Sequence, residues 1–332
     1  MSNPDKLKLV KDISIKATVF GIAQAPKSTR AFLGCSDFKV YEADLLAAKV
    51  EPKELYAHES YVTTVGLTTG GLVSGGYDGK LIWWDIDGNK QIRSIEAHSK
   101  WIRKIAVSPD GKFFASVADD MVCRVWDAKT GKKVHELRGH EELTPQHYVS
   151  MLYTVAYSAD GKQIATADKV GHIVVWDANS GKSLATMEAP VMYTWDPTQR
   201  RHSIGGIRSV AFSPDGSLLA VGGTGKIGNI DHLEANARIE VFTWKDQKQV
   251  NEFTADKAKG IVNHLAFSPD GAWLLGASGA GEGQLIFVDC KEKKILRQEK
   301  LPMHVHYFTL NEAGDTITSV GANKIAIHEM KG

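Results

Sequence analysis

The sequence predicts an all-β fold built from repeated four-stranded units, because three short patterns recur in the same order along the chain. The first is a Gly/Ala-His pair, which stands at Ala57-His58, Ala97-His98 and Gly139-His140. The second is a turn of the Ser-Pro-Asp-Gly type, and the third is an apolar run that closes in Trp-Asp. Self-similarity with a period of about 40 residues is typical of a fold made of one supersecondary unit used several times.

The turns show where each unit folds back on itself. Their copies are Ser108-Pro109-Asp110-Gly111, Ser158-Ala159-Asp160-Gly161, Ser213-Pro214-Asp215-Gly216 and Ser268-Pro269-Asp270-Gly271, with a diverged copy at Asn311-Glu312-Ala313-Gly314. Pro presets φ at the second turn position, Asp can bond to its own backbone, and Gly accepts the positive φ that closes a tight hairpin. We therefore expect each copy to join two antiparallel strands.

The Trp-Asp pairs stand at Trp84-Asp85, Trp126-Asp127 and Trp176-Asp177. With the preceding His and turn, these residues resemble the WD-repeat family of β-propellers, from about Leu7 to Met330. The resemblance implies a structural tetrad in which a His, a strand Ser or Thr, a turn Asp and the Trp are hydrogen-bonded. The matching residues are His58, Ser74, Asp78 and Trp84 in one repeat and His98, Ser116, Asp120 and Trp126 in the next. A third set, His140, Thr166 and Trp176, departs from the pattern because Asp168 stands farther ahead of its Trp.

Strand-rich units along the chain number seven, which predicts one propeller domain over residues 1–332 with seven four-stranded antiparallel blades. The inner strands are expected at residues 19–23, 62–67, 102–107, 152–157, 207–212, 262–267 and 305–310. The blades are expected at about 12–56, 57–96, 97–138, 139–188, 189–254, 255–300 and 301–330 plus 7–11. The last unit stops at its third strand, 324–329, and 7–10 is a spare alternating strand. We expect these two to pair and close the ring, because an open ring would leave strand edges exposed.

Composition narrows the class of partner. The 40 Lys and Arg nearly balance the 39 Asp and Glu, so no global positive field favours nucleic acid, which is not an expected partner. The chain has no long apolar run, and its N-terminal segment is charged. Together these two features predict a cytoplasmic protein with no membrane partner. Cys35, Cys123 and Cys290 fall on strands of different repeats without metal-ligand spacing, so we expect free thiols.

The repeat is interrupted at three places, residues 141–150, 189–206 and 224–237. Each insertion lies in a connection from an outer strand to the next inner strand or from a second to a third strand. In a propeller these connections emerge on one face, so the insertions are expected to form an ordered cap over blades four and five. Tyr193 and Trp195 either pin their own loop or contact a partner. Arg200 and Arg201 could bind a carboxylate or phosphate, or could simply be solvated.

The same face is expected to expose the residues that open each inner strand. These residues are rich in the types that are enriched in protein interfaces. The candidate partner-binding residues there are Tyr61, Trp101, Arg103, Tyr153, Arg208, His304 and His306, together with Tyr193, Trp195, Arg200 and Arg201 from the cap. In the resembled family this ring of residues is the usual peptide-docking surface. The sequence therefore predicts a non-catalytic scaffold or adaptor for a protein or peptide partner, without a cofactor.

The alternative is a small-molecule or metal-dependent enzyme with its site at the axial mouth of the same face. His304 and His306 lie on one side of one strand, but two imidazoles are fewer than the three protein ligands of a zinc site. The nearest further candidates, His202, Asp231 and His232, stand in loops. The sequence has no Gly-x-Ser-x-Gly elbow and no His-Glu-x-x-His motif. Neither a catalytic residue nor a metal ligand is predicted.

Overall fold

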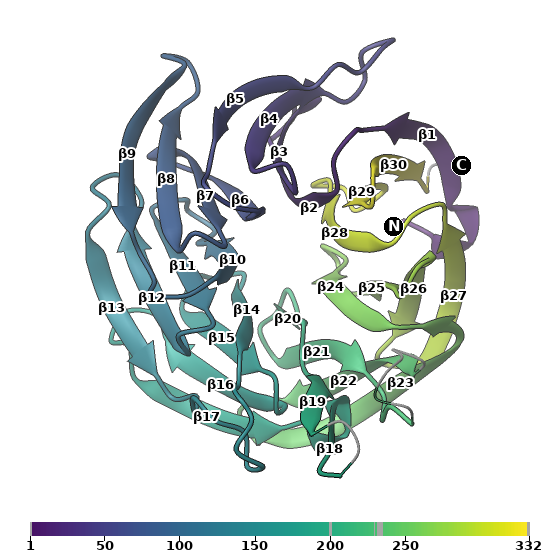
Figure 1. The fold of residues 1–332 in the computed structure, drawn as a ribbon. Coiled ribbons are helices and arrows are strands. Elements are labelled where there is room, and N and C mark those ends of the chain that lie inside the picture. Colours follow the sequence, from purple (N-terminus) through teal and green to yellow (C-terminus); the bar gives the residue numbers. More distant parts are fainter. Residues whose placement is uncertain (1, 199–200, 229, 231–234, 331–332) are drawn as a thin grey trace.

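The chain forms a ring of seven four-stranded antiparallel sheets in the computed structural model, which describes residues 2–198, 201–228, 230 and 235–330 (Figure 1). Within each blade the strands follow one another in chain order from the centre of the ring outwards, except that the N-terminal strand is the outermost strand of the last blade. The predicted all-β, seven-bladed fold is confirmed. None of the helices in the described ranges is long and apolar enough to span a membrane.

The strands of the blades have the following bounds. Blade one holds β2 (Val19–Gln24), β3 (Arg30–Cys35), β4 (Lys39–Asp44) and β5 (Lys53–Ala57). Blade two holds β6 (Val62–Thr68), β7 (Gly71–Gly76), β8 (Lys80–Asp85) and β9 (Lys90–Glu96). Blade three holds β10 (Ile102–Val107), β11 (Phe113–Ala118), β12 (Val122–Asp127) and β13 (Lys133–Arg138). Blade four holds β14 (Leu152–Tyr157), β15 (Gln163–Asp168), β16 (His172–Asp177) and β17 (Ser183–Glu188).

Blade five holds β20 (Ser209–Phe212), β21 (Leu218–Thr224), β22 (Asn236–Thr243) and β23 (Lys248–Lys259). Blade six holds β24 (Ile261–Phe267), β25 (Leu274–Gly279), β26 (Gly283–Asp289) and β27 (Lys294–Leu301). Blade seven holds β28 (Val305–Leu310), β29 (Thr316–Gly321), β30 (Lys324–Glu329) and β1 (Lys8–Ser14). Outside the blades are the short 3-10 helices η1 (Pro4–Lys6) and η2 (Pro190–Met192) and a hairpin of β18 (Tyr193–Asp196) and β19 (His202–Gly205).

The inner strands begin at the predicted residue or its neighbour in every blade except the fifth, where β20 begins at Ser209 rather than residue 207. The difference has a local cause. Gly205 and Gly206 have φ values of +100° and +98°, and the Ile207 N–H donates to the Asp168 carbonyl of blade four. This segment is therefore tied to the neighbouring blade before it joins its own.

The Ser-Pro-Asp-Gly turns fold as the sequence predicts. In the first copy the Asp110 carboxylate accepts hydrogen bonds from the Ser108 hydroxyl at 2.7 Å and the Lys112 N–H at 3.0 Å, while Gly111 has φ +69°. Because the turn satisfies its own polar groups, it needs no support from the rest of the molecule. This self-sufficiency is why the turn repeats so faithfully in sequence.

The ring closes through β1, which pairs antiparallel with β30 from Lys8↔Glu329 to Ser14↔Lys324 (Figure 1). The predicted closure is confirmed, and the closing strand extends beyond residues 7–10. The Arg297 side chain adds a second tie, because its Nη1 donates to the backbone carbonyls of Pro4 and Asp5 at 3.0 and 2.9 Å. The two ends of the chain thus share one blade.

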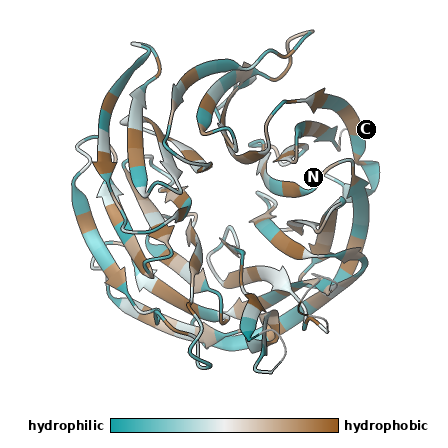
Figure 2. Cartoon of the chain, viewed as in Figure 1, coloured by the Kyte–Doolittle hydropathy of each residue, from teal (hydrophilic) through white to brown (hydrophobic). Residues whose placement is uncertain are grey.

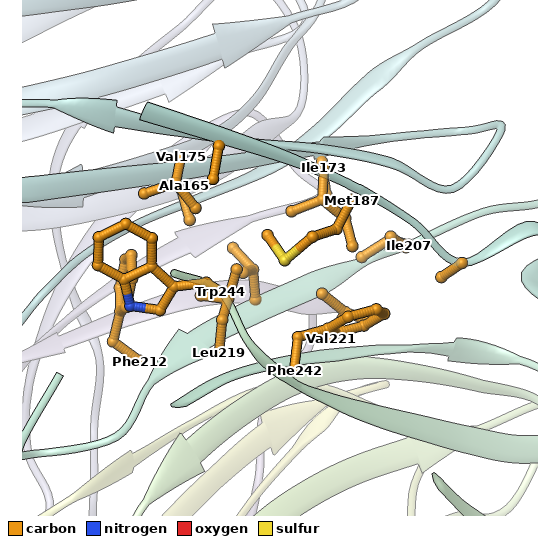
Figure 3. Packing of buried hydrophobic residues seen from close by; sticks show 14 of the residues in the cluster. Ala165, Ile173, Val175, Met187, Ile207, Phe212, Leu219, Val221, Phe242 and Trp244 are labelled. Atoms are coloured by element: carbon orange, nitrogen blue, oxygen red, sulfur yellow. The ribbon is translucent and has the colours of Figure 1, made fainter. Parts of the chain in front are cut away.

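The hydrophobic core lies between blades. Figure 3 shows the cluster between blades four and five, where Ile173, Val175 and Met187 pack against residues such as Leu219 and Val221. In Figure 2, hydrophobic residues run along many of the strands, while outer strands such as β13 alternate with hydrophilic ones. A middle strand is covered on both faces, so it needs apolar residues at consecutive positions. This packing makes the ring a rigid frame for the residues at its centre.

Candidate partner-binding mouth

The His-containing tetrad of blade three is a buried relay of hydrogen bonds. Trp126 Nε1 donates to Ser116 Oγ at 2.8 Å, and Ser116 Oγ lies 2.7 Å from His98 Nε2. His98 Nδ1 lies 3.1 Å from the Asp120 carboxylate. Burial lowers the pKa of His98 despite the opposing effect of Asp120, so the ring is neutral at pH 7, and Arg124 Nη1 lies 2.6 Å from the same Nδ1 that faces Asp120. These residues hold the blade together and face no opening at the axis.

The blade-two tetrad needs one correction. His58 contacts Ser74 Oγ at 2.7 Å and Asp78 at 2.9 Å, as the resemblance implies, but Trp84 Nε1 has no partner in the described structure. Tyr56 of blade one takes its place, because its hydroxyl lies 2.9 Å from Ser74 Oγ and its ring stacks on Trp84 at 4.6 Å. A substitute from the preceding strand cannot be recognised from the spacing within one repeat.

The blade-four set is complete despite its different spacing. His140 lies 2.9 Å from Asp168 and 2.8 Å from Thr166, and Trp176 Nε1 donates to Thr166 Oγ1 at 2.9 Å. Asp168 ends β15, and its carboxylate also accepts the backbone N–H groups of Val170 and His172 at 3.0 Å. The expected departure in this repeat therefore changes the turn and leaves the tetrad intact.

The three insertions contact one another and form a single structure, which we call the cap (described residues of 141–150, 189–206 and 224–237). The Tyr148 hydroxyl donates to the Asp196 carbonyl at 3.0 Å, and the Ile227 N–H donates to Thr194 Oγ1 at 3.1 Å. Met192 is fully buried beneath the β18–β19 hairpin. In Figure 1 this hairpin appears over the outer part of blades four and five, away from the ring centre.

The cap residues predicted to bind a partner are therefore separate from the axial mouth. Tyr193 is half-buried and Trp195 is 43% exposed, both on β18. Arg201 is exposed, and Arg200 lies outside the described residues, as do Asp231 and His232. Cap and mouth meet at Arg208, whose Nη2 donates to the cap carbonyl of Gly205 at 3.3 Å.

A β-bulge near the start of the inner strands shapes the mouth. The pairing register shifts at this point in β2, β6, β10, β14, β24 and β28, which are the inner strands of every blade except the fifth. A bulge inserts one residue and redirects its side chain. We call the bulged residues and their blade-five equivalent the mouth ring: Phe20, Thr63, Arg103, Tyr153, Arg208, Asn263 and His306.

Aromatic and imidazole rings follow one another around half of this mouth. We call the series the aromatic arc: His304, His306, Phe20, Tyr61, Tyr77 and Trp101. Successive ring centroids are 4.6, 5.0, 5.8, 5.7 and 4.3 Å apart. Tyr61 and Trp101 are 42% and 48% exposed. Large rings that remain accessible in a continuous row are typical of a surface that binds another molecule.

Positive side chains continue the arc toward blade five. Arg103 packs within 5.1 to 5.5 Å of the Tyr77, Trp101 and Tyr153 rings and forms a two-point ion pair with Asp119 at 2.7 and 2.6 Å. The guanidinium was expected to be exposed, but the side chain is only 14% exposed because these partners surround it. Tyr153, also expected to be exposed, is buried beneath Arg103 and Arg208.

Arg208 and Lys169 lie beside this pair without a carboxylate of their own among the described residues. The Arg208 guanidinium lies 3.5 Å from the Tyr153 ring centroid, and its Nε is buried without a hydrogen-bond partner. Lys169 Nζ donates to the Val149 carbonyl at 3.2 Å. Burial lowers the pKa of both side chains, and the Arg208 charge lowers that of Lys169 further. We call Arg103, Lys169 and Arg208 the cation cluster.

One residue deeper, Lys104 lies in the throat of the ring. Its Nζ is 3.4 Å from Thr154 Oγ1, 3.5 Å from His264 Nδ1 and 5.5 Å from the Tyr307 ring centroid. Burial lowers the pKa of Lys104 to about 8. His264 stacks on Tyr307 at 3.7 Å, and burial holds its pKa well below the ordinary value, so this imidazole is neutral.

Sequence reasoning missed Lys104, Lys169 and Tyr77. One signal was available for Lys104, because Arg103 and Lys104 are consecutive polar residues inside a strand that is otherwise apolar. Two polar residues in succession on a buried inner strand indicate a bulge that turns both side chains toward the axis. Lys169 and Tyr77 come from loops, whose positions relative to the mouth depend on how the blades pack.

The histidine pair of the mouth is arranged for stacking. His304 and His306 stack at 4.6 Å, and His304 Nε2 lies 3.1 Å from Asn263 Nδ2. In the described ranges, no group of three or more His, Cys, Asp or Glu side chains is placed to hold a metal ion.

A pocket of about 390 Å³ lies at the Ser-Pro-Asp-Gly turns. The Asp110 and Asp160 carboxylates that line it accept hydrogen bonds from their own turns.

Comparison with known families agrees with this geometry. The model of the WD domain, G-beta repeat, matches residues 50–85, 89–127, 195–227 and 247–288. These segments fall on four parts of a seven-bladed ring whose tetrads join His, Ser or Thr, Asp and Trp. The chain is a β-propeller that carries WD repeats. Its third matched segment includes residues 195–206 and 224–227 of the cap, while residues 141–150 lie outside the matched segments.

Curated relatives match this WD-repeat propeller over short stretches. Nuclear distribution protein PAC1-2 of Uncinocarpus reesii is 35% identical over 22% of this chain and 16% of its own length. Nuclear distribution protein PAC1 of Arthroderma otae is 39% identical over 17% of this chain and 12% of its own. The Notchless protein homolog of Arabidopsis thaliana is 35% identical over 25% of this chain and 18% of its own length. The chain thus spans less than a fifth of each of these relatives.

Proposed function

We propose that this WD-repeat propeller is a non-catalytic adaptor that binds a protein or peptide partner at its axial mouth, on the face that carries the cap. The observation that carries the proposal is the aromatic arc, in which Tyr61 and Trp101 remain 42% and 48% exposed although they belong to a continuous row of rings. Exposed aromatic residues on a rigid frame contribute large contact areas at a low cost in conformational entropy.

The titratable groups of the mouth favour binding over acid–base chemistry. Asp119 is held in its two-point ion pair with Arg103. Burial, and then the neighbouring His304, lower the pKa of His306 to about 4, so its ring is neutral near pH 7. A general acid or base works best with a pKa near the working pH. The ion pair of Asp119 and the low pKa of His306 therefore support recognition more strongly than catalysis at the mouth, whereas Lys104 in the throat, with a pKa of about 8, falls within the range of a general acid or base.

A cytoplasmic location is part of the proposal. Cys35, Cys123 and Cys290 are free thiols, and burial raises the pKa of each. Unpaired cysteines are typical of proteins that reside in a reducing compartment. Fractionation of the source cells followed by immunodetection tests the location directly, and recovery of the protein outside the cytoplasm would contradict it.

The binding proposal is tested by affinity capture from the source cells, with quantitative mass spectrometry of the captured proteins. The mouth variant combines Tyr61→Ala with Trp101→Ala, and it leaves Arg103 in place because removal of that residue would strand Asp119. The control variant combines Val134→Ala with Leu184→Ala, which are exposed apolar residues on the outer strands β13 and β17.

We expect the mouth variant to lose proteins that the wild type and the control variant both retain. Circular dichroism melts of all three proteins establish that the ring is folded. Unchanged capture by the folded mouth variant would refute the proposed surface. Loss of the same proteins only after substitutions in the Ser-Pro-Asp-Gly turns would place binding on the opposite face.

A further inference from the structure

The cation cluster carries more positive charge than its surroundings neutralise. Arg103 is paired with Asp119, whose negative charge also acts on Arg208 and Lys169, but within the described ranges neither of these two forms an ion pair of its own. Across the whole chain, 40 basic and 39 acidic residues almost cancel. The excess of positive charge is therefore local to the mouth, because the molecule as a whole is close to neutral.

Burial of Arg208 and Lys169 also reduces the stability of the folded protein. Arg208 Nε is buried without an acceptor, and burial lowers the pKa of Arg208 and Lys169. A partly desolvated guanidinium or ammonium without a counter-charge destabilises the fold unless another group offsets the lost hydration. Tyr153 offsets part of this loss for Arg208 through its ring face. An anion from a partner would supply the remaining counter-charge.

Arg208 and Lys169 each donate one hydrogen bond to a backbone carbonyl, and each has further N–H donors. Arg208 gives Nη2 to the Gly205 carbonyl, and Lys169 gives one of its three donors to the Val149 carbonyl. Both acceptors belong to the cap. The cation cluster thus lies at the junction of cap and mouth, beside the aromatic arc through Arg103, which packs on Trp101 and Tyr77.

We propose that the mouth recognises an acidic peptide segment of the partner, in which an Asp or Glu carboxylate binds Arg208 and Lys169 and neighbouring apolar side chains lie on the aromatic arc. The inference rests on the proposed function and adds the chemistry of the partner. A carboxylate matches the forked donors of Arg208. The cluster is small, and the broad positive surface that nucleic-acid binding requires is not provided by a chain of formal net charge +1.

The test uses four pools of fluorescein-labelled nonapeptides on the immobilised full-length protein. All flanking positions are random uncharged residues, and the central position is Glu, Gln, Lys or phosphoserine. The proteins compared are the wild type, Arg208→Gln, Arg208→Lys and the control Lys182→Gln. Lys182 is an exposed residue in the turn between β16 and β17, on the face opposite the cap. Retention is measured at low and high NaCl concentration.

The wild type and Lys182→Gln are expected to retain the Glu pool about tenfold more than the Gln pool. A tenfold difference in affinity is about what one additional charge-assisted hydrogen bond is expected to contribute. Arg208→Gln is expected to lower this ratio to about one, and Arg208→Lys to keep part of it, because charge is restored without the fork. High salt is expected to reduce the ratio in the wild type. Arg208→Gln should melt at or above the wild-type temperature, since it removes a partly buried cation that forms no ion pair of its own.

Equal retention of the Glu and Gln pools, or no retention of any pool, would overturn the inference. Preference for the phosphoserine pool over the Glu pool would overturn the carboxylate as the ligand. Tighter Arg208-dependent binding of single-stranded dT20 than of the Glu pool would replace the peptide by nucleic acid. If the pools bind equally but Trp101→Ala abolishes their binding, the acidic preference fails while the proposed adaptor surface stands.

Discussion

Replacement of Lys104 by Met is expected to stabilise the propeller near neutral pH. The ammonium lies in the throat of the ring, and its polar neighbours, Thr154 Oγ1 and His264 Nδ1, are at the long distances of 3.4 and 3.5 Å. Burial lowers the pKa of Lys104 from 10.5 to about 8. At about 1.4 kcal/mol for each tenfold change in the ionisation constant, this difference corresponds to about 3 kcal/mol.

The effect of pH on this stability difference follows from the fact that burial disfavours the protonated form of Lys104. Below pH 8 Lys104 is protonated in both the folded and the unfolded protein, so the full penalty of about 3 kcal/mol opposes folding. As the pH rises from 8 toward 10.5 the folded protein carries the neutral amine and the penalty declines, to about 1 kcal/mol at pH 10. Met keeps the apolar volume without the charge, so the gain in stability is large at pH 7 and small at pH 10.

Urea unfolding of the wild type and Lys104→Met at pH 7 and pH 10 measures this gain, and the difference between the proteins cancels the titration of all other groups. The control is Lys132→Met, an exposed residue in the turn between β12 and β13, which is expected to change stability by less than about 0.5 kcal/mol. Destabilisation at pH 7, or a gain of equal size at both pH values, would refute the reasoning.

Two further predictions concern the scaffold. Trp126→Phe is expected to lower the free energy of unfolding by about 1 kcal/mol more than Trp84→Phe, because only Trp126 Nε1 donates to a buried partner, Ser116 Oγ. Urea unfolding of both variants checks this, and equal costs would contradict it. Removal of residues 2–14 is expected to abolish hydrogen-exchange protection of β30 on its outer edge and to lower the melting temperature, because β1 covers that edge. Unchanged exchange and melting would show that closure contributes nothing to stability.

Local chemistry explains why so much of the fold was accessible from the sequence. The turn around Asp110 and Gly111 satisfies its own hydrogen bonds, and inner strands of successive repeats end in similar apolar runs just before the turn, such as Ile105-Ala106-Val107 and Val210-Ala211-Phe212. Both features act within a few residues, so they can be recognised without knowledge of the rest of the chain. Ring closure followed from the same logic, since an unpaired last strand and a spare first strand were both visible.

The contacts of the candidate site depend on residues from different blades. Tyr56 replaces Trp84 at Ser74, and Arg103 is covered by rings from blades two, three and four. Arg208 lies on Tyr153 across a blade boundary. No spacing rule within a repeat specifies such contacts, because they depend on how the blades are placed around the axis.

The sequence by itself determined the number of blades, the turns, the closing strand and the face that carries the insertions, because each is encoded by a local pattern that repeats or is interrupted. Only the tertiary structure decided that Arg103 and Tyr153 are covered, although they were expected to be exposed like Trp101, and that Arg208 and Lys169 lie beside the aromatic arc without counter-ions of their own among the described residues. Exposure and charge balance are properties of the assembled ring, since they depend on every side chain that reaches the same point in space.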